Sequence, residues 1–139
     1  MALVVTQTEM EQALSSMYPY WNANGYKMHL FQNNYTPLIT SVASDFTECT
    51  FGGYSGGIYL TSWSGGTIAF ITPRAFIYHA DVVWTATGAS TNSVYGYYVL
   101  DGSGVLRWAE RRPGGAVTVG AITGQTYTVS PLFSQRSEF

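Results

Sequence analysis

The sequence contains little charge, a single cysteine and no long apolar run. Its Asp, Glu, Lys and Arg residues make up 10% of the 139 positions, against about 25% in an average soluble domain. The six basic residues are spread along the chain, which excludes the basic stripe that a nucleic-acid-binding protein uses to neutralise phosphates. No apolar run approaches the roughly 18 residues that span a bilayer. We therefore expect neither nucleic acid nor a membrane as a partner.

The lone cysteine, Cys49, excludes an internal disulfide, so the fold does not depend on an oxidising compartment. The first residues also lack the basic and long apolar regions of a signal peptide, which predicts synthesis in the cytoplasm. At 139 residues the chain is expected to form one domain, 1–139. Within it we expect an N-terminal arm and short helix over 1–26 and β-structure over 27–139.

Aromatic residues are abundant where charged residues are scarce. The chain has 11 Tyr, 7 Phe and 4 Trp, and its formal net charge is −2. A net charge near zero promotes association. The composition therefore predicts that other proteins cover much of the surface of this chain, as they do inside an assembly.

The N-terminal region carries the signals of one short helix. Thr8 and Glu11 have the spacing of a capping box, in which the two side chains satisfy backbone amides at the start of a helix. Apolar residues then follow at helical spacing: Met10, Ala13, Leu14 and Met17. This pattern predicts an amphipathic helix over 9–17, ended by Pro19 and by the turn-forming cluster 22–25.

From residue 28 onward the sequence alternates between short strand patterns and Gly-rich turns. The strand candidates are 28–31, 46–51, 58–63, 67–71, 75–86, 94–100, 105–111, 116–119 and 126–133. The clearest turn is the hairpin loop 101–104, whose glycines supply the positive φ of a short β-turn. The spacing predicts an all-β fold, an antiparallel β-sandwich of about eight strands with one short N-terminal helix. Its topology, jelly-roll or immunoglobulin-like, stays open.

Two sequence patterns could carry catalytic chemistry. Residues 53–57 match the G-x-S-x-G pattern around a hydrolase nucleophile, here Ser55. That pattern works only where a strand turns sharply into a helix, and a strand pattern follows here, so a flexible loop is favoured. Asp45 and Glu48 could form an acid/base pair, but catalytic carboxylates of that kind face each other across a substrate. We favour a turn cap for Asp45 and a solvated or interfacial face for Glu48.

The remaining reactive residues give no catalytic or metal-binding pattern. His29 and His79 have no second imidazole or carboxylate at ligand spacing. The densest group of charges lies on one predicted strand: Arg107, Glu110, Arg111 and Arg112. It is either a binding patch or, as we favour, an edge strand protected by charge. We therefore predict no enzyme, no cofactor, and no catalytic or metal-ligating residue.

Several blocks of the sequence resemble one protein family. In chain order they are the start at Leu3-Val4-Val5 and residues 28–37, 45–48, 53–54, 94–101, 108–111 and 128–133. On these blocks the chain is similar to a family of small, uncharacterised virion-associated proteins of tailed bacteriophages. The resemblance implies a virion component, foremost a capsid decoration (cement) protein on the capsid surface with the major capsid protein as its partner. It implies no catalytic or ligand-binding residue.

The leading hypothesis is therefore a structural protein that stabilises the phage head by protein–protein contacts. Icosahedral lattices offer three-fold positions, so a homo-oligomer, in particular a trimer, is expected. The expected assembly contact is the apolar N-terminal arm: Met1, Ala2, Leu3, Val4, Val5 and Thr6. Two alternatives stay open: a tail or fibre module that binds host glycans through exposed Trp and Tyr, and a small hydrolase built on Ser55 or on the Asp45–Glu48 pair.

Overall fold

The computed structural model describes residues 17–65 and 74–136. Strands make up 38% of it and helix 9%, and the strand pairs are antiparallel wherever their register is defined. This confirms the expected all-β fold. The described residues hold eleven strands rather than about eight, because several of the predicted strands are divided by short interruptions.

Contacts divide the described chain into two compact units. Residues 17–23, 60–65, 74–82 and 129–136 form the first, and residues 24–59 and 83–128 form the second. The expectation of a single domain, with its division at 26/27, stays a prediction.

The first unit contains the helix α2 (Met17–Ala23) and one three-stranded sheet. The sheet has the order β11-β4-β3, with β3 at Trp63–Gly65, β4 at Arg74–His79 and β11 at Leu132–Arg136. Trp21 of the helix packs on Trp63, with ring centroids 4.8 Å apart, and both side chains are buried. This aromatic pair fixes the helix against the rest of its unit.

The helix corrects one sequence prediction and leaves another untested. Pro19 does not end a helix, because α2 continues through it from Met17 to Ala23. Proline is tolerated in the first turn, where its missing N–H would have no intrahelical partner. The helix predicted over 9–17 lies outside the described residues, apart from Met17.

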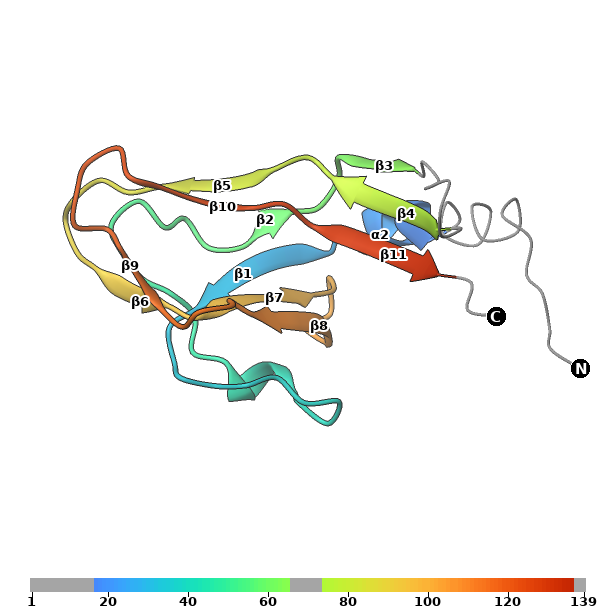
Figure 1. Cartoon of the computed structure of the whole chain (residues 1–139), viewed down its shortest axis with the longest axis horizontal. Coiled ribbons are helices and arrows are strands. Elements are labelled where there is room, and N and C mark those ends of the chain that lie inside the picture. The colour runs from blue at the N-terminus through green and yellow to red at the C-terminus, as the bar shows by residue number, and fades with distance from the viewer. Residues whose placement is uncertain (1–16, 66–73, 137–139) are drawn as a thin grey trace, which may run out of the picture. The chain divides into compact units, whose positions relative to one another are not determined.

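The second unit is built on a four-stranded sheet with the order β2-β1-β7-β8 (Figure 1). Its strands are β1 (Lys27–Phe31), β2 (Ile58–Tyr59), β7 (Gly96–Leu100) and β8 (Leu106–Arg111). Two further pairs are β6 (Asn92–Val94) with β9 (Val117–Val119), and β5 (Val82–Thr85) with β10 (Thr126–Val129). Apolar side chains on both faces of β1 and β7 are buried: Met28, Leu30, Phe31, Tyr98 and Val99. Central strands of this kind carry apolar residues on consecutive positions rather than in alternation.

The predicted strand 46–51 is wrong. A 3₁₀ turn, η1 (Ala43–Asp45), precedes this segment, which makes one isolated bridge, between Glu48 and Phe31. Side chains replace the strand partners: Thr47 N donates to Asn33 Oδ1, and Thr50 N donates to Asn92 Oδ1. Phe46, Cys49 and Phe51 are nonetheless buried, so the apolar pattern of this segment indicates burial without a strand ladder.

Four other predicted strands are divided, and one is not covered. The predictions 58–63, 75–86, 94–100 and 126–133 correspond to β2 and β3, β4 and β5, β6 and β7, and β10 and β11. Pro131 has no N–H for a ladder, which accounts for the last of these breaks. The predicted strand 67–71 lies outside the described residues.

Candidate interaction surface

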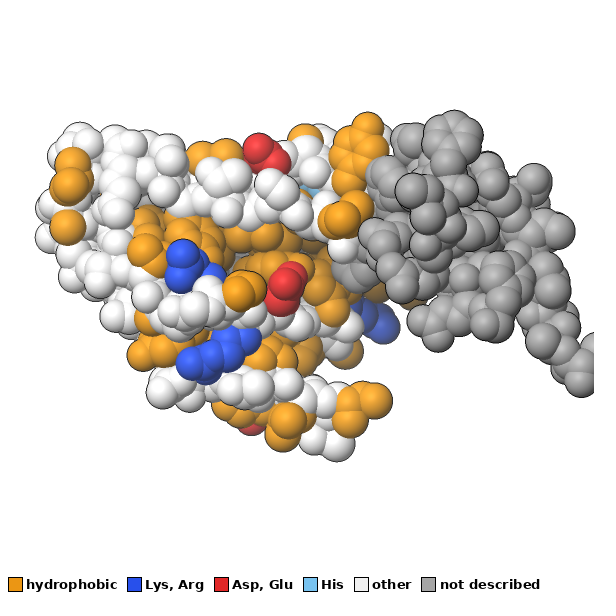
Figure 2. Space-filling view, viewed as in Figure 1, with side chains coloured by type: hydrophobic (Ala, Val, Ile, Leu, Met, Phe, Trp, Pro, Cys, Tyr) orange, Lys and Arg blue, Asp and Glu red, His pale blue; other side chains and the backbone are white. Residues whose placement is uncertain are grey.

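A projecting loop leaves the four-stranded sheet after β1 (Figure 1). It carries three exposed apolar side chains at its end. Leu38, Ile39 and Val42 expose 64%, 104% and 54% of their surface. We call these three residues the loop tip. Apolar side chains are visible on this loop in the space-filling view (Figure 2). Loops are usually polar, so apolar side chains gathered at one loop end are typical of a binding site.

The loop tip is held by hydrogen bonds within the loop. Ser41 N donates to Leu38 O at 3.0 Å, and Leu38 N donates to Ser41 Oγ at 2.8 Å. The Tyr35 hydroxyl lies 2.7 Å from the same Ser41 Oγ. Val42 N donates to Asp45 Oδ2 at 2.8 Å. The proposed turn-capping role of Asp45 is therefore confirmed, and the loop tip has a defined conformation.

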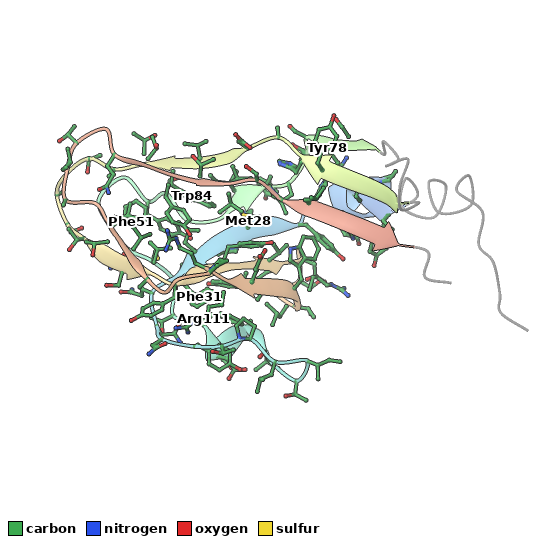
Figure 3. All side chains as sticks on the ribbon, in the orientation of Figure 1. Met28, Phe31, Phe51, Tyr78, Trp84 and Arg111 are labelled. Atoms are coloured by element: carbon green, nitrogen blue, oxygen red, sulfur yellow. The ribbon has the colours of Figure 1, made fainter. Side chains whose placement is uncertain are left out.

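Arg111 ties the base of the loop to strand β8 (Figure 3). Its Nη1 donates to Tyr35 O at 2.9 Å, and its Nη2 donates to Asn34 Oδ1 at 2.7 Å. Its guanidinium carbon lies 5.2 Å from the centroid of the Tyr95 ring, within the range of a cation–π contact. A planar guanidinium can make these contacts at once, which a lysine cannot do.

Among the described strands β8 stands at the end of the sheet order, as the prediction of an edge strand requires, whereas protection of that edge by charge stays a prediction. Its charges are engaged within the chain. Arg107 pairs with Asp101 at 2.6 Å, and Glu110 accepts a hydrogen bond from Tyr97 at 2.9 Å. Hydrogen bonds from the backbone N–H of Val105 and from Arg107 lower the pKa of Asp101. These contacts stabilise the predicted hairpin loop 101–104 and pair Arg107 with a carboxylate.

A groove runs between the loop and strand β8. Residues 41–44 and 104–106 line one hollow of about 470 Å³. A second hollow of about 330 Å³ lies between 37–39, Ser41 and β8 residues 106–109. The two hollows share Ser41 and Leu106, so they form one surface, which we call the β8 groove.

The structure also brings together a polar cluster that the sequence did not reveal. His29 Nδ1 lies 2.7 Å from Glu48 Oε1, and the Tyr54 hydroxyl donates to the same oxygen at 2.9 Å. Leu30 N donates to the Tyr54 hydroxyl oxygen at 3.1 Å. The His29 ring stacks on Tyr98, with centroids 5.1 Å apart. Glu48, expected on a solvated or interfacial face, contacts His29 and Tyr54, and its side chain remains 41% exposed.

The groups around this cluster are poor nucleophiles. Burial, helped by the Glu48 charge, raises the pKa of the Cys49 thiol to about 12. Burial also raises the pKa of Tyr54 far above its ordinary value. Ser55 is exposed and makes no hydrogen bond to His29 or Glu48 within the described chain. The geometry therefore favours a structural cluster that fixes the segment 48–54 against β1.

The glycines around Ser55 have packing reasons of their own. A Cβ at Gly57 would collide with the His29 ring, and one at Gly53, which has φ 93°, would collide with the Thr85 carbonyl. No non-glycine residue in the described ranges has a positive φ, whereas a nucleophile elbow is strained at its serine. Strand β2 follows the motif rather than a helix. Residues 53–57 thus form a close-packed loop.

The other histidine, His79, belongs to the first unit and is not part of the polar cluster. It is buried, its Nε2 accepts from Ser62 N at 2.8 Å, and its Nδ1 lies 2.6 Å from Ala80 O. This arrangement requires the neutral ring with its proton on Nδ1, and burial lowers the His79 pKa accordingly. Within residues 17–65 and 74–136 no three His, Cys, Asp or Glu side chains gather to hold a metal ion. No helix in those ranges is long and apolar enough to cross a membrane.

The tryptophans do not form a glycan-binding platform. Trp21, Trp63 and Trp84 are buried, and Trp108 is partly buried. Carbohydrate recognition by stacking requires an exposed ring face. The glycan hypothesis would have to depend on exposed tyrosines such as Tyr59, whose ring already faces Lys27 Nζ at 4.3 Å.

The predicted assembly contact, Met1–Thr6, lies outside the described residues. Comparison of the chain with protein-family models, curated proteins and solved structures finds no significant match. The resemblance to the virion-associated family therefore stays a prediction. Sequence reasoning missed the loop tip, and its one available signal was the apolar pair Leu38-Ile39 directly after a predicted turn.

Proposed function

We propose that this chain is a non-enzymatic structural protein of a phage virion that decorates the capsid surface and stabilises the head. Its loop tip would bind the lattice of the major capsid protein. The observation that carries this proposal is the loop tip itself, three exposed apolar side chains on a loop fixed by Asp45 and Arg111.

The energetics favour a binding role for the loop tip. Burying apolar surface yields about 25 cal/mol per Å², so each tip side chain could contribute about 1–3 kcal/mol. Flexible loops lose part of such a gain when they become ordered on binding. Hydrogen bonds from Leu38, Ser41 and Val42 already order this loop, so less of the gain is lost.

A direct test compares two exposed isoleucines. Ile39→Ser removes a tip side chain, and Ile122→Ser removes one that is 68% exposed in the turn between β9 and β10. Purified capsid shells lacking the protein are mixed with each variant and sedimented, and bound chain is measured. We expect Ile39→Ser to weaken binding about tenfold and Ile122→Ser to leave it unchanged.

Two outcomes would contradict the proposal. Full-length chain that does not sediment with shells would exclude capsid decoration. Equal binding of the two serine variants would exclude the loop tip as the contact. Copy counting by mass spectrometry of purified virions adds an independent test, because a decoration protein occurs in multiples set by the capsid lattice and a tail protein in far fewer copies.

A further inference from the structure

We propose that the β8 groove binds the N-terminal arm of a second copy of this chain, residues Met1–Thr6, as an added β-strand. This contact between copies does not depend on the capsid, so it goes beyond the proposed function. Its partner is identified by the chemistry of the groove and of the arm.

The first argument is the open edge of the sheet. Within the described residues β8 pairs only with β7, and an edge strand directs alternate N–H and C=O groups away from its sheet. Proteins often block such an edge with charge. Here Arg107 and Glu110 are held by Asp101 and Tyr97, so the edge stays accessible to an extended peptide.

The second argument is the lining of the groove. Pro37, Leu38 and Ile39 form one side, and Leu106 and Ala109 lie on the other. The one charged residue in this part of the groove, Arg107, is neutralised by Asp101. An uncharged extended segment with apolar side chains fits this surface, because strand addition takes affinity from backbone hydrogen bonds and specificity from side-chain pockets.

The third argument is that the chain itself contains such a segment. Leu3, Val4 and Val5 are consecutive apolar residues, two of them β-branched, and the first charged side chain is Glu9. β-branched residues favour the extended conformation. With residues 1–8 extended and the helix predicted over 9–17, the residues before Met17 reach about 40 Å. That length would let the first residues contact a neighbouring copy.

Arm exchange of this kind is compatible with any closed cyclic oligomer. Each copy gives one arm and offers one groove, so reciprocal exchange closes a dimer and head-to-tail exchange closes a larger ring. A cyclic trimer satisfies every arm and every groove. In such a ring no β8 edge is left open.

The test is disulfide trapping between two different chains. One preparation carries Val4→Cys and the other Ile39→Cys, at the rim of the groove. A matched control uses Ile122→Cys in place of Ile39→Cys, since both isoleucines are exposed. The native Cys49 gives little background, because it is buried and its thiol stays protonated. We expect a cross-linked heterodimer from the groove pair, at least tenfold more abundant than from the control pair.

Sedimentation of the full chain and of a chain lacking residues 1–6 completes the test. We expect the full chain to be oligomeric and the shortened chain to be monomeric, with the same far-UV circular dichroism. Equal cross-linking of the groove and control pairs, or an unchanged mass after the deletion, would overturn the proposal. A Val4→Cys, Ile39→Cys double variant that closes its disulfide within one chain would also overturn it, because the arm would then occupy its own groove. Ile39 belongs both to the loop tip and to the rim of the groove, so shell binding by Ile39→Ser is also measured in the chain lacking residues 1–6. An equal loss there assigns the effect to the capsid contact, so failure of the arm proposal leaves the capsid proposal to its own test.

Discussion

Replacing Tyr54 with Phe tests whether the polar cluster at His29 stabilises the fold. The substitution keeps the ring, which lies 5.3 Å from Phe51 and 6.1 Å from Trp84, centroid to centroid. It removes only the hydroxyl, which accepts from Leu30 N at 3.1 Å and donates to Glu48 Oε1 at 2.9 Å. Any loss of stability is then attributable to hydrogen bonding rather than to packing.

The magnitude follows from what each partner loses. Leu30 is fully buried, so its N–H is left without an acceptor, at a cost of about 1–3 kcal/mol. The Glu48 carboxylate is 41% exposed and keeps its contact with His29, so water replaces much of the second bond. We expect a total of about 2 kcal/mol, which for a slope of about 2 kcal/mol/M lowers the urea midpoint by about 1 M.

The control is Tyr59→Phe, the same chemical change on a side chain that is 57% exposed. It should alter stability by less than about 0.5 kcal/mol. Urea unfolding followed by tryptophan fluorescence and by circular dichroism gives both midpoints and slopes. If Tyr54→Phe and Tyr59→Phe unfold at the same urea concentration, the cluster contributes nothing measurable and the reasoning is refuted.

Three other changes have signs set by the structure. Burial lowers the pKa of His79, so the stability that neutral His79 contributes is present above about pH 6.5 and is lost as the pH falls through the folded pKa. His79→Gln should therefore reduce the dependence of the urea midpoint on pH between 7 and 5. The pKa of Cys49 is raised from 9.0 to about 12, so the free energy of unfolding should fall as the pH rises through that interval, and it should fall less in Cys49→Ala. The native thiol should also not react with a disulfide reagent at pH 8. Gly96→Ala places a methyl group against the Glu110 carbonyl and should lower the free energy of unfolding by about 3 kcal/mol. Gly114 has open space around it, so Gly114→Ala should lower it by about 1 kcal/mol, because of the positive φ at this position. Thermal unfolding would resolve this difference.

Features that depend on neighbouring residues could be predicted from the sequence. The hairpin loop 101–104 forms because Asp101 Oδ1 accepts hydrogen bonds from Ser103 N and Val105 N, and Gly104 has φ 81°. Every one of these groups lies within five positions of the others. The all-β class and the charged edge at β8 follow in the same way, from short strand patterns and local charge.

Features that depend on distant residues could not be predicted. Arg111 contacts Tyr35 across 76 positions, and His29 contacts Glu48 across 19. The second pair depends on one bridge between Phe31 and Glu48, and neither segment alone determines a register of this kind. The same limit explains the wrong strand at 46–51, where side-chain amides from residues 33 and 92 take the place of a neighbouring strand.

The two surprises of the structure have different explanations, and the difference bears on function. In the polar cluster, the His29, Glu48 and Tyr54 side chains satisfy one another, so the fold itself explains why they are there. The loop tip is the opposite case, since Leu38, Ile39 and Val42 each expose more than half of their surface, so most of their apolar surface does not stabilise this chain. Polar residues would serve a mere connection better, yet Arg111 and Asp45 hold this loop in place. Binding to another protein accounts both for the apolar tip and for the hydrogen bonds that position it.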